Sequence, residues 1–261
     1  MRIVRFTPGP DAGLGPDPLF GVLEDDGLIS IISGDPIYSG IQKTAATIAL
    51  NKVRLLAPII PRSKVVCVGK NYADHAAEMG GVVPDEPIIF LKPNTSVIGP
   101  NDTIVWPEMS ERIDHEAELA IVIGRMCKDV PKERVNDVIF GYTIANDVTA
   151  RDLQKRDGQW TRAKSFDTFC PIGPWVDTDF IPGTQKITAT IAGEVKQSAQ
   201  ISDMIFDVPT IINFVSRVMT LLPGDIILTG TPAGIGPMVA GEKATMAIEG
   251  LGELTNKLSA R

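Results

Sequence analysis

Short apolar runs separated by Gly and Pro dominate the chain and predict many strands and few helices. Runs of this length bounded by turn residues are typical of strands. After residue 60 they occupy 64–68, 88–91, 103–106, 119–123, 138–143, 186–191, 226–229 and 244–248. Two stretches favour helices: 72–79, and 208–222, which tolerates Pro209 near its start and ends at Leu222-Pro223-Gly224. The pattern predicts a β-rich α+β fold.

The first sixty residues favour a small separate module. Apolar runs at 21–24 and 28–31 flank Asp25-Asp26-Gly27, and an Asp-Gly pair supplies the positive φ angles of a hairpin turn. Residues 44–51 are predicted to form a short helix. Pro58 and Pro61 then interrupt the chain. We therefore expect a domain boundary near residue 60, with one domain over 1–60 and the main domain over 61–261.

Composition and charge narrow the class of protein. The chain has 261 residues, 44% of them hydrophobic, and a net charge of −7. Sequence-independent nucleic-acid binding requires clustered positive charge, so we expect no nucleic-acid partner. No apolar run has the length of a membrane-spanning helix, and the first ten residues lack the apolar core of a signal peptide. Three widely spaced cysteines predict unpaired thiols. We expect a cytoplasmic protein that does not bind membranes.

A pair of glutamates leads into one of the apolar runs. If 114–124 is a strand, Glu116 and Glu118 project from one face, together with Ala120 and Val122. Two such carboxylates repel each other and lose hydration on burial, which is costly unless a proton or a cation neutralises them. Taken alone, the pattern is common and favours a solvated strand end with two ordinary surface glutamates.

A third carboxylate follows another apolar strand at Asp147. If the two strands are neighbours, three carboxylates converge, and such oxygen-only ligation suits Mg²⁺ or Mn²⁺ rather than zinc. Nearby cations would then hold an anionic substrate, for which Arg151 and Lys164 are candidates. An ordinary surface ion pair is the alternative for each.

The chain has only two histidines, which excludes a three-histidine metal site. His75 and Glu78 are three residues apart on one face of a predicted helix, which suits an acid–base pair or a solvent-facing pair. His115 would face away from Glu116 in a strand and is interpreted as structural. The Gly-rich segment 228–236 follows a strand and is either a carboxylate-binding loop or a plain turn.

These motifs together resemble the fumarylacetoacetate hydrolase superfamily, in particular its short bacterial and mitochondrial branch. Six blocks carry the resemblance, in family order: 68–75 (VGKNYADH), 90–93 (FLKP), 114–119 (DHEAEL), 146–154 (NDVTARDLQ), 160–167 (WTRAKSFD) and 229–234 (TGTPAG). The resemblance implies a mixed β-sandwich roll with a small N-terminal α/β domain, a Mg²⁺ or Mn²⁺ site, and a homodimer.

The resemblance also implies residue roles. The metal ligands are Glu116, Glu118 and Asp147. The catalytic residues are Lys164 and a His75–Glu78 dyad on a mobile lid. Substrate-binding roles fall to Arg151, Gln154, Thr231 and Gly230.

The implied chemistry passes through an enolate. A 2-oxo acid can chelate a dication through its C1 carboxylate and C2 carbonyl oxygen, and the metal stabilises the enolate formed when a bond at C3 breaks. The presence of both His75 and Glu78 favours C–C cleavage of a small 2-oxo (di)carboxylic acid, by oxaloacetate decarboxylation or acylpyruvate hydrolysis. A 2-hydroxyhepta-2,4-diene-1,7-dioate isomerase is the alternative. A non-catalytic, metal-bound binding protein on the same fold is a second alternative.

Overall fold

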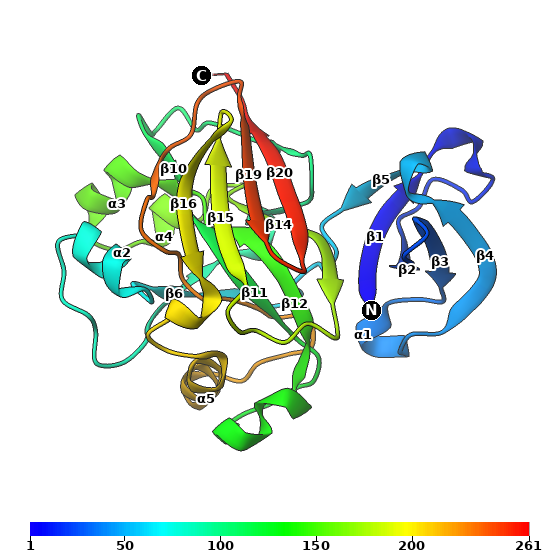
Figure 1. Ribbon diagram of the computed structural model, residues 1–261, viewed down its shortest axis with the longest axis horizontal. Coiled ribbons are helices and arrows are strands. Elements are labelled where there is room, and N and C mark those ends of the chain that lie inside the picture. The colour runs from blue at the N-terminus through cyan, green and yellow to red at the C-terminus, as the bar shows by residue number, and fades with distance from the viewer. Residues whose placement is uncertain (261) are drawn as a thin grey trace.

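One large mixed sheet runs through both parts of the molecule (Figure 1). The computed structural model describes residues 1–260. The strand order of this sheet is β4 (Lys43–Ala49), β3 (Leu28–Ile32), β2 (Leu19–Leu23), β1 (Arg2–Pro8), β14 (Cys170–Asp177), β12 (Ile139–Asn146), β11 (Ala117–Ile123), β17 (Ile226–Leu228), β6 (Val65–Gly69) and β7 (Ile88–Lys92), with β5 (Val53–Leu56) paired to β1 and β8 (Val97–Ile98) paired to β14.

Within residues 1–260, two smaller sheets and five α-helices accompany the large sheet. A five-stranded sheet has the order β16 (Glu194–Gln200), β15 (Lys186–Ile191), β19 (Lys243–Ile248), β20 (Gly252–Leu258) and β9 (Thr103–Ile104). A three-stranded sheet has the order β13 (Thr149–Ala150), β10 (Ile113–His115) and β18 (Gly236–Pro237). The helices are α1 (Pro36–Ser39), α2 (Ala73–Glu78), α3 (Arg151–Asp157), α4 (Thr161–Lys164) and α5 (Val208–Val218). This strand-rich architecture confirms the predicted α+β fold.

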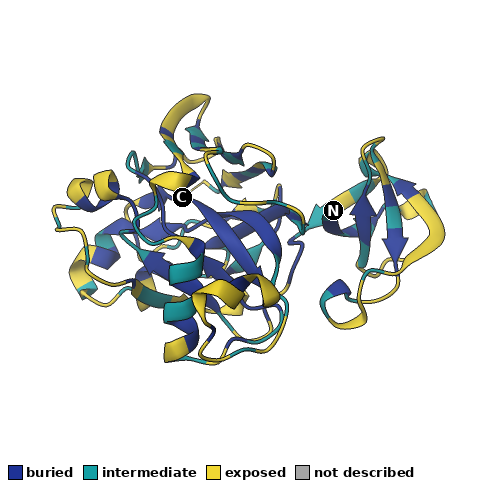
Figure 2. Ribbon diagram, turned by 60° about the horizontal axis from the view of Figure 1, so that its bottom comes forward, coloured by how far each residue is buried: buried dark blue, intermediate teal, exposed yellow. Residues whose placement is uncertain are grey.

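The main core lies between the large and the five-stranded sheets, whose central strands are buried (Figure 2). Strand β11 is buried on both faces. Leu119 and Ile121 pack in the core with Ile187 of β15, whereas Ala120 and Val122 pack in a second cluster behind the sheet. An apolar run without alternation is typical of a strand covered on both sides. This burial makes any charge at the end of β11 expensive to desolvate.

The first part of the chain forms β1 to β5 and the short α-helix α1, which lies at one end of these strands, at the right of Figure 1. The helix predicted at 44–51 is wrong, because residues 43–49 form β4. The alanines there favour a helix, but Thr47 pairs with Ser30 of β3 and Ile48 with Ile29, and sheet pairing overrides this weak local preference. The Asp25-Asp26-Gly27 turn does join two antiparallel strands, β2 and β3.

The two helices predicted after residue 60, one short and one longer, differ in how closely their predicted ends match the structure. Helix α2 occupies 73–78, close to the expected 72–79. Helix α5 begins at Val208, where the Asp207 side chain accepts a hydrogen bond from the Thr210 amide (2.9 Å). It ends at Val218, four residues before the expected end.

No helix within residues 1–260 is both long and apolar enough to cross a membrane. The three cysteines are free thiols.

Candidate active site

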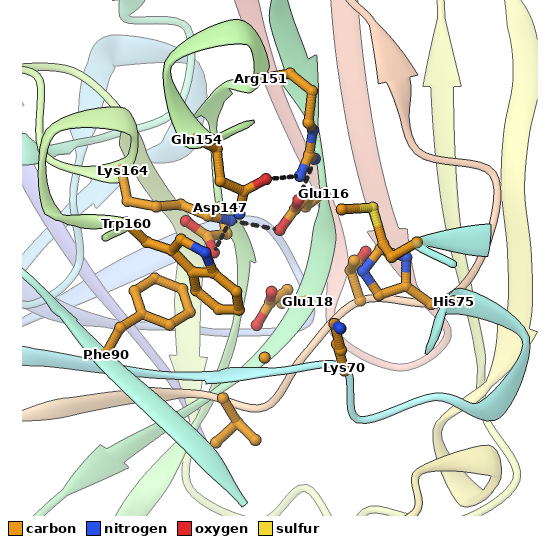
Figure 3. A pocket seen from close by; sticks show the side chains of 14 residues that line it. Lys70, His75, Phe90, Glu116, Glu118, Asp147, Arg151, Gln154, Trp160 and Lys164 are labelled. Atoms are coloured by element: carbon orange, nitrogen blue, oxygen red, sulfur yellow. Dashed lines mark hydrogen bonds and ion pairs between the residues drawn. The ribbon is translucent and has the colours of Figure 1, made fainter. Parts of the chain in front are cut away.

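Three buried carboxylates meet where β11 begins and β12 ends. Residues Ala117 and Asn146 are paired across these strands, and the Asp147 amide donates to the Glu116 carbonyl oxygen (2.9 Å). This register places Glu116, Glu118 and Asp147 together, with one carboxylate oxygen of each within 4.8 Å of the others. None is more than 4% exposed. The structure therefore brings together the three residues predicted as metal ligands (Figure 3).

Buried cations compensate two of the three carboxylates. Lys164 Nζ donates to Glu116 Oε2 (2.8 Å) and to Asp147 Oδ2 (2.6 Å), and Lys92 Nζ donates to Asp147 Oδ1 (2.5 Å). The Arg151 guanidinium contacts Glu116 and also donates to Asp114 Oδ2 (2.9 Å). These pairs explain how the charges are accommodated in the interior, because a buried ion is stable only when it is paired and hydrogen-bonded.

Glu118 is compensated least. Its Oε2 accepts one hydrogen bond, from the Gly230 amide (2.6 Å). Burial, together with the negative charges of Asp147 and Glu116, raises the pKa of Glu118 well above its usual range. For Glu116, burial acts in the same direction, but the positive charges of Lys164 and Arg151 outweigh it and hold the pKa of that carboxyl well below its usual range. The cluster thus keeps one carboxylate that lacks a cationic partner.

This donor set fits a hard divalent cation. All three groups offer oxygen, they face one another, and the repulsion that raises the Glu118 pKa is the repulsion that a bound cation relieves. Glu116, Glu118 and Asp147 would therefore hold Mg²⁺ or Mn²⁺. Softer ions select sulfur or imidazole, and neither is present in this trio.

The affinity for Mn²⁺ should rise with pH. Below its raised pKa the Glu118 carboxyl carries a proton that the cation must displace, whereas above that pKa no proton is displaced. Below the raised pKa of Glu118, the apparent affinity for Mn²⁺ should increase about tenfold per pH unit, and above that pKa it should stay constant. Calorimetry in buffers of different ionisation enthalpy counts the released protons. The matched Glu118→Gln variant should bind weakly and release none; a pH-independent affinity in the unaltered protein would contradict the interpretation.

The predicted His75–Glu78 dyad belongs to α2 and lies beside the acidic trio of Glu116, Glu118 and Asp147. His75 Nδ1 is 3.2 Å from Glu78 Oε2, and His75 is only 6% exposed. The Gly234 amide donates to both Glu78 oxygens (3.2 and 3.3 Å), which links α2 to the Gly-rich loop. With Nδ1 directed to Glu78, the imidazole keeps Nε2 for proton transfer. His75 lines the same cavity as the carboxylates.

The Gly-rich loop is held against β11. The Gly230 amide is used by Glu118, and a side chain at 230 would collide with Asn71, 2.6 Å from its Cβ. Thr231 lines the cavity, donates its hydroxyl to the Ala117 carbonyl oxygen (2.9 Å) and accepts from Gln197 Nε2 (2.7 Å). Substrate binding by Thr231 and Gly230 stays a prediction.

A small cavity of about 30 Å³ joins these groups. Arg151 and Gln154 of α3 enter it together, with Arg151 Nη1 donating to Gln154 Oε1 (2.5 Å). Phe90 and Trp160 form an apolar wall, their rings edge to face at 5.1 Å. The cavity thus combines cations and an acid–base pair with a surface that limits water.

Sequence reasoning missed two residues that support the site. Lys92 belongs to one of the six family blocks, and a lysine that ends an apolar strand is itself a signal for a buried charge partner. Gln197 lies on β16, far away in sequence, and accepts from the Ala117 amide (2.9 Å) while its Nε2 holds the Gly-rich loop at Thr231. No local pattern marks Gln197. His115, predicted to be structural, contacts Gln197 through Nδ1 (3.1 Å) and does not line the cavity.

A strand-rich fold with a buried acidic cluster at one cavity is typical of an enzyme active site. Residues 64–259 match the family model described as fumarylacetoacetate (FAA) hydrolase C-terminal, and residues 1–58 match one described as Rv2993c-like, N-terminal. The chain therefore belongs to the fumarylacetoacetate hydrolase family.

Similar proteins carry several activities in their names. Protein Rv2993c of Mycobacterium tuberculosis is 56% identical, covering 85% of this chain and 83% of its own length. The mitochondrial oxaloacetate tautomerase Fahd2a of Rattus norvegicus is 44% identical, covering 80% and 70%.

Solved structures extend the similarity along the whole chain. The 5-carboxymethyl-2-hydroxymuconate delta-isomerase of Mycobacterium smegmatis is 46% identical with a TM-score of 0.91, covering 100% of both chains. The maleylpyruvate hydrolase of Sphingobium sp. SYK-6, in complex with manganese(II) and pyruvate, is 32% identical with a TM-score of 0.80, covering 99% of both chains.

Proposed function

We propose that this chain is a divalent-metal-dependent enzyme that acts on a small 2-oxo (di)carboxylic acid through an enolate. The observation that carries the proposal is the meeting of three buried carboxylates and a His–Glu pair at one cavity. Acid clusters alone are common, but a positioned imidazole beside them supplies the proton transfer that enolate chemistry requires. The manganese and pyruvate bound to the similar maleylpyruvate hydrolase support the same ligand class.

The residues divide the work between binding and proton transfer. Glu116, Glu118 and Asp147 would hold the cation, which when bound supplies a Lewis acid for a 2-oxo acid. Lys164 is a protonated ammonium, because Asp147 and Glu116 outweigh its burial and raise its pKa. It places positive charge where negative charge develops on the substrate.

On the other side of the cavity, His75 would move a proton at its Nε2. Glu78 orients the imidazole through Nδ1, and the Gly234 amide orients Glu78 in turn. A base held in this way is limited to one tautomer and one direction of transfer. Phe90 and Trp160 exclude water from the remaining wall.

We expect the reaction to be C–C cleavage, by oxaloacetate decarboxylation or acylpyruvate hydrolysis. The dyad supports this expectation, since His75 can activate a water for hydrolysis or return a proton to C3 after loss of CO₂.

A second candidate is proton transfer without cleavage, as in enol–keto tautomerisation or diene isomerisation. The similarity to an oxaloacetate tautomerase and to a delta-isomerase favours it. The same residues would serve, because only the fate of the enolate differs.

Assays on the protein loaded with Mn²⁺ separate these reactions. Oxaloacetate, acetylpyruvate and 2-hydroxyhepta-2,4-diene-1,7-dioate are each added, and pyruvate and the enol absorbance are followed. Pyruvate from either of the first two supports cleavage. Loss of the oxaloacetate enol without pyruvate, or conversion of the diene, supports the second candidate. Protein treated with EDTA is the matched control and should be inactive. Tight Mn²⁺ binding with no turnover of any of the three would overturn both candidates in favour of a non-catalytic binding protein.

A further inference from the structure

Lys70 stands out among the cations of the cavity because it has no acidic partner. Arg151 and Lys164, the other lysine and arginine side chains that line it, are paired with carboxylates of the cluster. Within residues 1–260, Lys70 makes no hydrogen bond or ion pair. Its positive charge is therefore available to a ligand, whereas the charges of Arg151 and Lys164 are already shared.

The backbone at Lys70 is also unusual. Its φ angle of 57° lies in the left-handed region, which glycine and asparagine adopt more readily than lysine. The conformation is enforced by Asn71, whose side chain donates to the Thr229 carbonyl oxygen (2.7 Å) and pairs with the backbone of Phe206 (3.0 and 2.8 Å). Strain maintained by its surroundings is characteristic of functional positions.

The side chain points into the cavity. In Figure 3, Lys70 extends from the end of β6 toward the space between Glu118 and His75, on the other side of the carboxylates from Lys164 and Gln154. Its Nζ lies against the chain after α2, where a Cβ on Gly81 would be 2.6 Å away. The absence of a side chain at Gly81 leaves room for the ammonium beside the dyad helix.

We infer that Lys70 binds the distal carboxylate of a dicarboxylic substrate, and so selects 2-oxo diacids over 2-oxo monoacids. The inference rests on the proposed function, in which the 2-oxo end of the substrate faces the acidic trio. Arg151, Gln154 and Lys164 surround that end, so the tail of the substrate is left to face Lys70. An unpaired ammonium recognises a carboxylate by a charge-assisted hydrogen bond.

Calorimetry on the Mn²⁺-loaded protein tests this with two matched ligands. 2-Oxoglutarate carries a distal carboxylate, 2-oxopentanoate carries a methyl group in its place, and neither has a group that can leave from C3. The Lys70→Met variant should weaken 2-oxoglutarate binding about 10- to 100-fold and leave 2-oxopentanoate binding unchanged. The Lys70→Arg variant should bind 2-oxoglutarate with nearly unchanged affinity. Lys155 is exposed, and the control variant Lys155→Met changes the net charge by the same amount as Lys70→Met. The control variant should bind both ligands normally.

The outcomes separate this inference from the proposed function. The inference fails if the unaltered protein binds both ligands equally well. It also fails if Lys70→Met leaves the binding of both ligands unchanged or weakens both to the same extent. In each case Lys70 does not bind the distal carboxylate, while the proposed function stands. If the Mn²⁺-loaded, unaltered protein binds neither ligand, the proposed function fails and the inference fails with it. Thermal unfolding of each variant, together with its Mn²⁺ affinity, verifies that fold and metal site are intact.

Discussion

Replacing His75 with alanine should slow turnover about 10²- to 10⁴-fold, the usual contribution of a general base, and leave the affinity for Mn²⁺ unchanged. The imidazole contacts Glu78 and lines the cavity, but it makes no hydrogen bond to the carboxylate trio in the described chain. Its loss therefore removes proton transfer without removing a metal ligand. Steady-state rates with the best substrate, and Mn²⁺ titration by calorimetry, measure the two effects separately.

The matched control is Glu78→Gln. Glutamine keeps an oxygen for the Gly234 amide, so α2 should stay attached to the Gly-rich loop, while the charge that orients His75 is lost. Its rate should fall less than that of His75→Ala. If His75→Ala turns over at the normal rate, α2 only covers the cavity, and the base must lie elsewhere.

Replacing Asp147 with alanine should abolish Mn²⁺ binding and also lower the free energy of unfolding by about 3–5 kcal/mol, the usual cost of removing one partner from a buried ion pair. Asp147 holds two buried ammonium groups, Lys92 and Lys164. Lys164 keeps Glu116, but Lys92 keeps only the Val148 carbonyl oxygen at 3.2 Å. Calorimetry reports the metal site, and urea denaturation of the metal-free protein reports stability.

A second substitution separates the two roles of Asp147. Adding Lys92→Met to Asp147→Ala removes the unpaired charge, so part of the lost stability should return while Mn²⁺ binding stays absent. Unchanged Mn²⁺ affinity in Asp147→Ala would exclude this residue from the metal site. An unchanged free energy of unfolding would mean that Lys92 finds another partner.

The acidic cluster was predictable because it depends on local rules. Alternation along an extended chain predicts Glu116 and Glu118 on one face, and the two do converge although Glu116 lies in a one-residue break between β10 and β11. Two consecutive apolar runs are also commonly neighbours in a sheet. The observed pairing of Ala117 with Asn146 is the register that brings Asp147 to them. The spacing of His75 and Glu78 on a helix is local in the same way, and the two side chains are in contact.

The remaining features depend on contacts between distant segments. Gln197 meets the site only because β16 belongs to a different sheet packed against β11. Residues 43–49 form a strand because β3 offers a free edge, although their alanines favour a helix. In both cases the contacting strand is distant in sequence, so these contacts cannot be predicted from local propensity.

The charge balance at the carboxylates sets an order of events. Asp114, Glu116, Glu118 and Asp147 are buried, and four cations contact them: the buried Lys92, Arg151 and Lys164, and the half-exposed Arg112, which contacts Asp114. When all four acids are ionised, these charges cancel and the cluster offers an organic anion little attraction; a bound dication would make it net positive. The ion should therefore load first and the acid second, which makes cellular metal supply a switch for substrate capture.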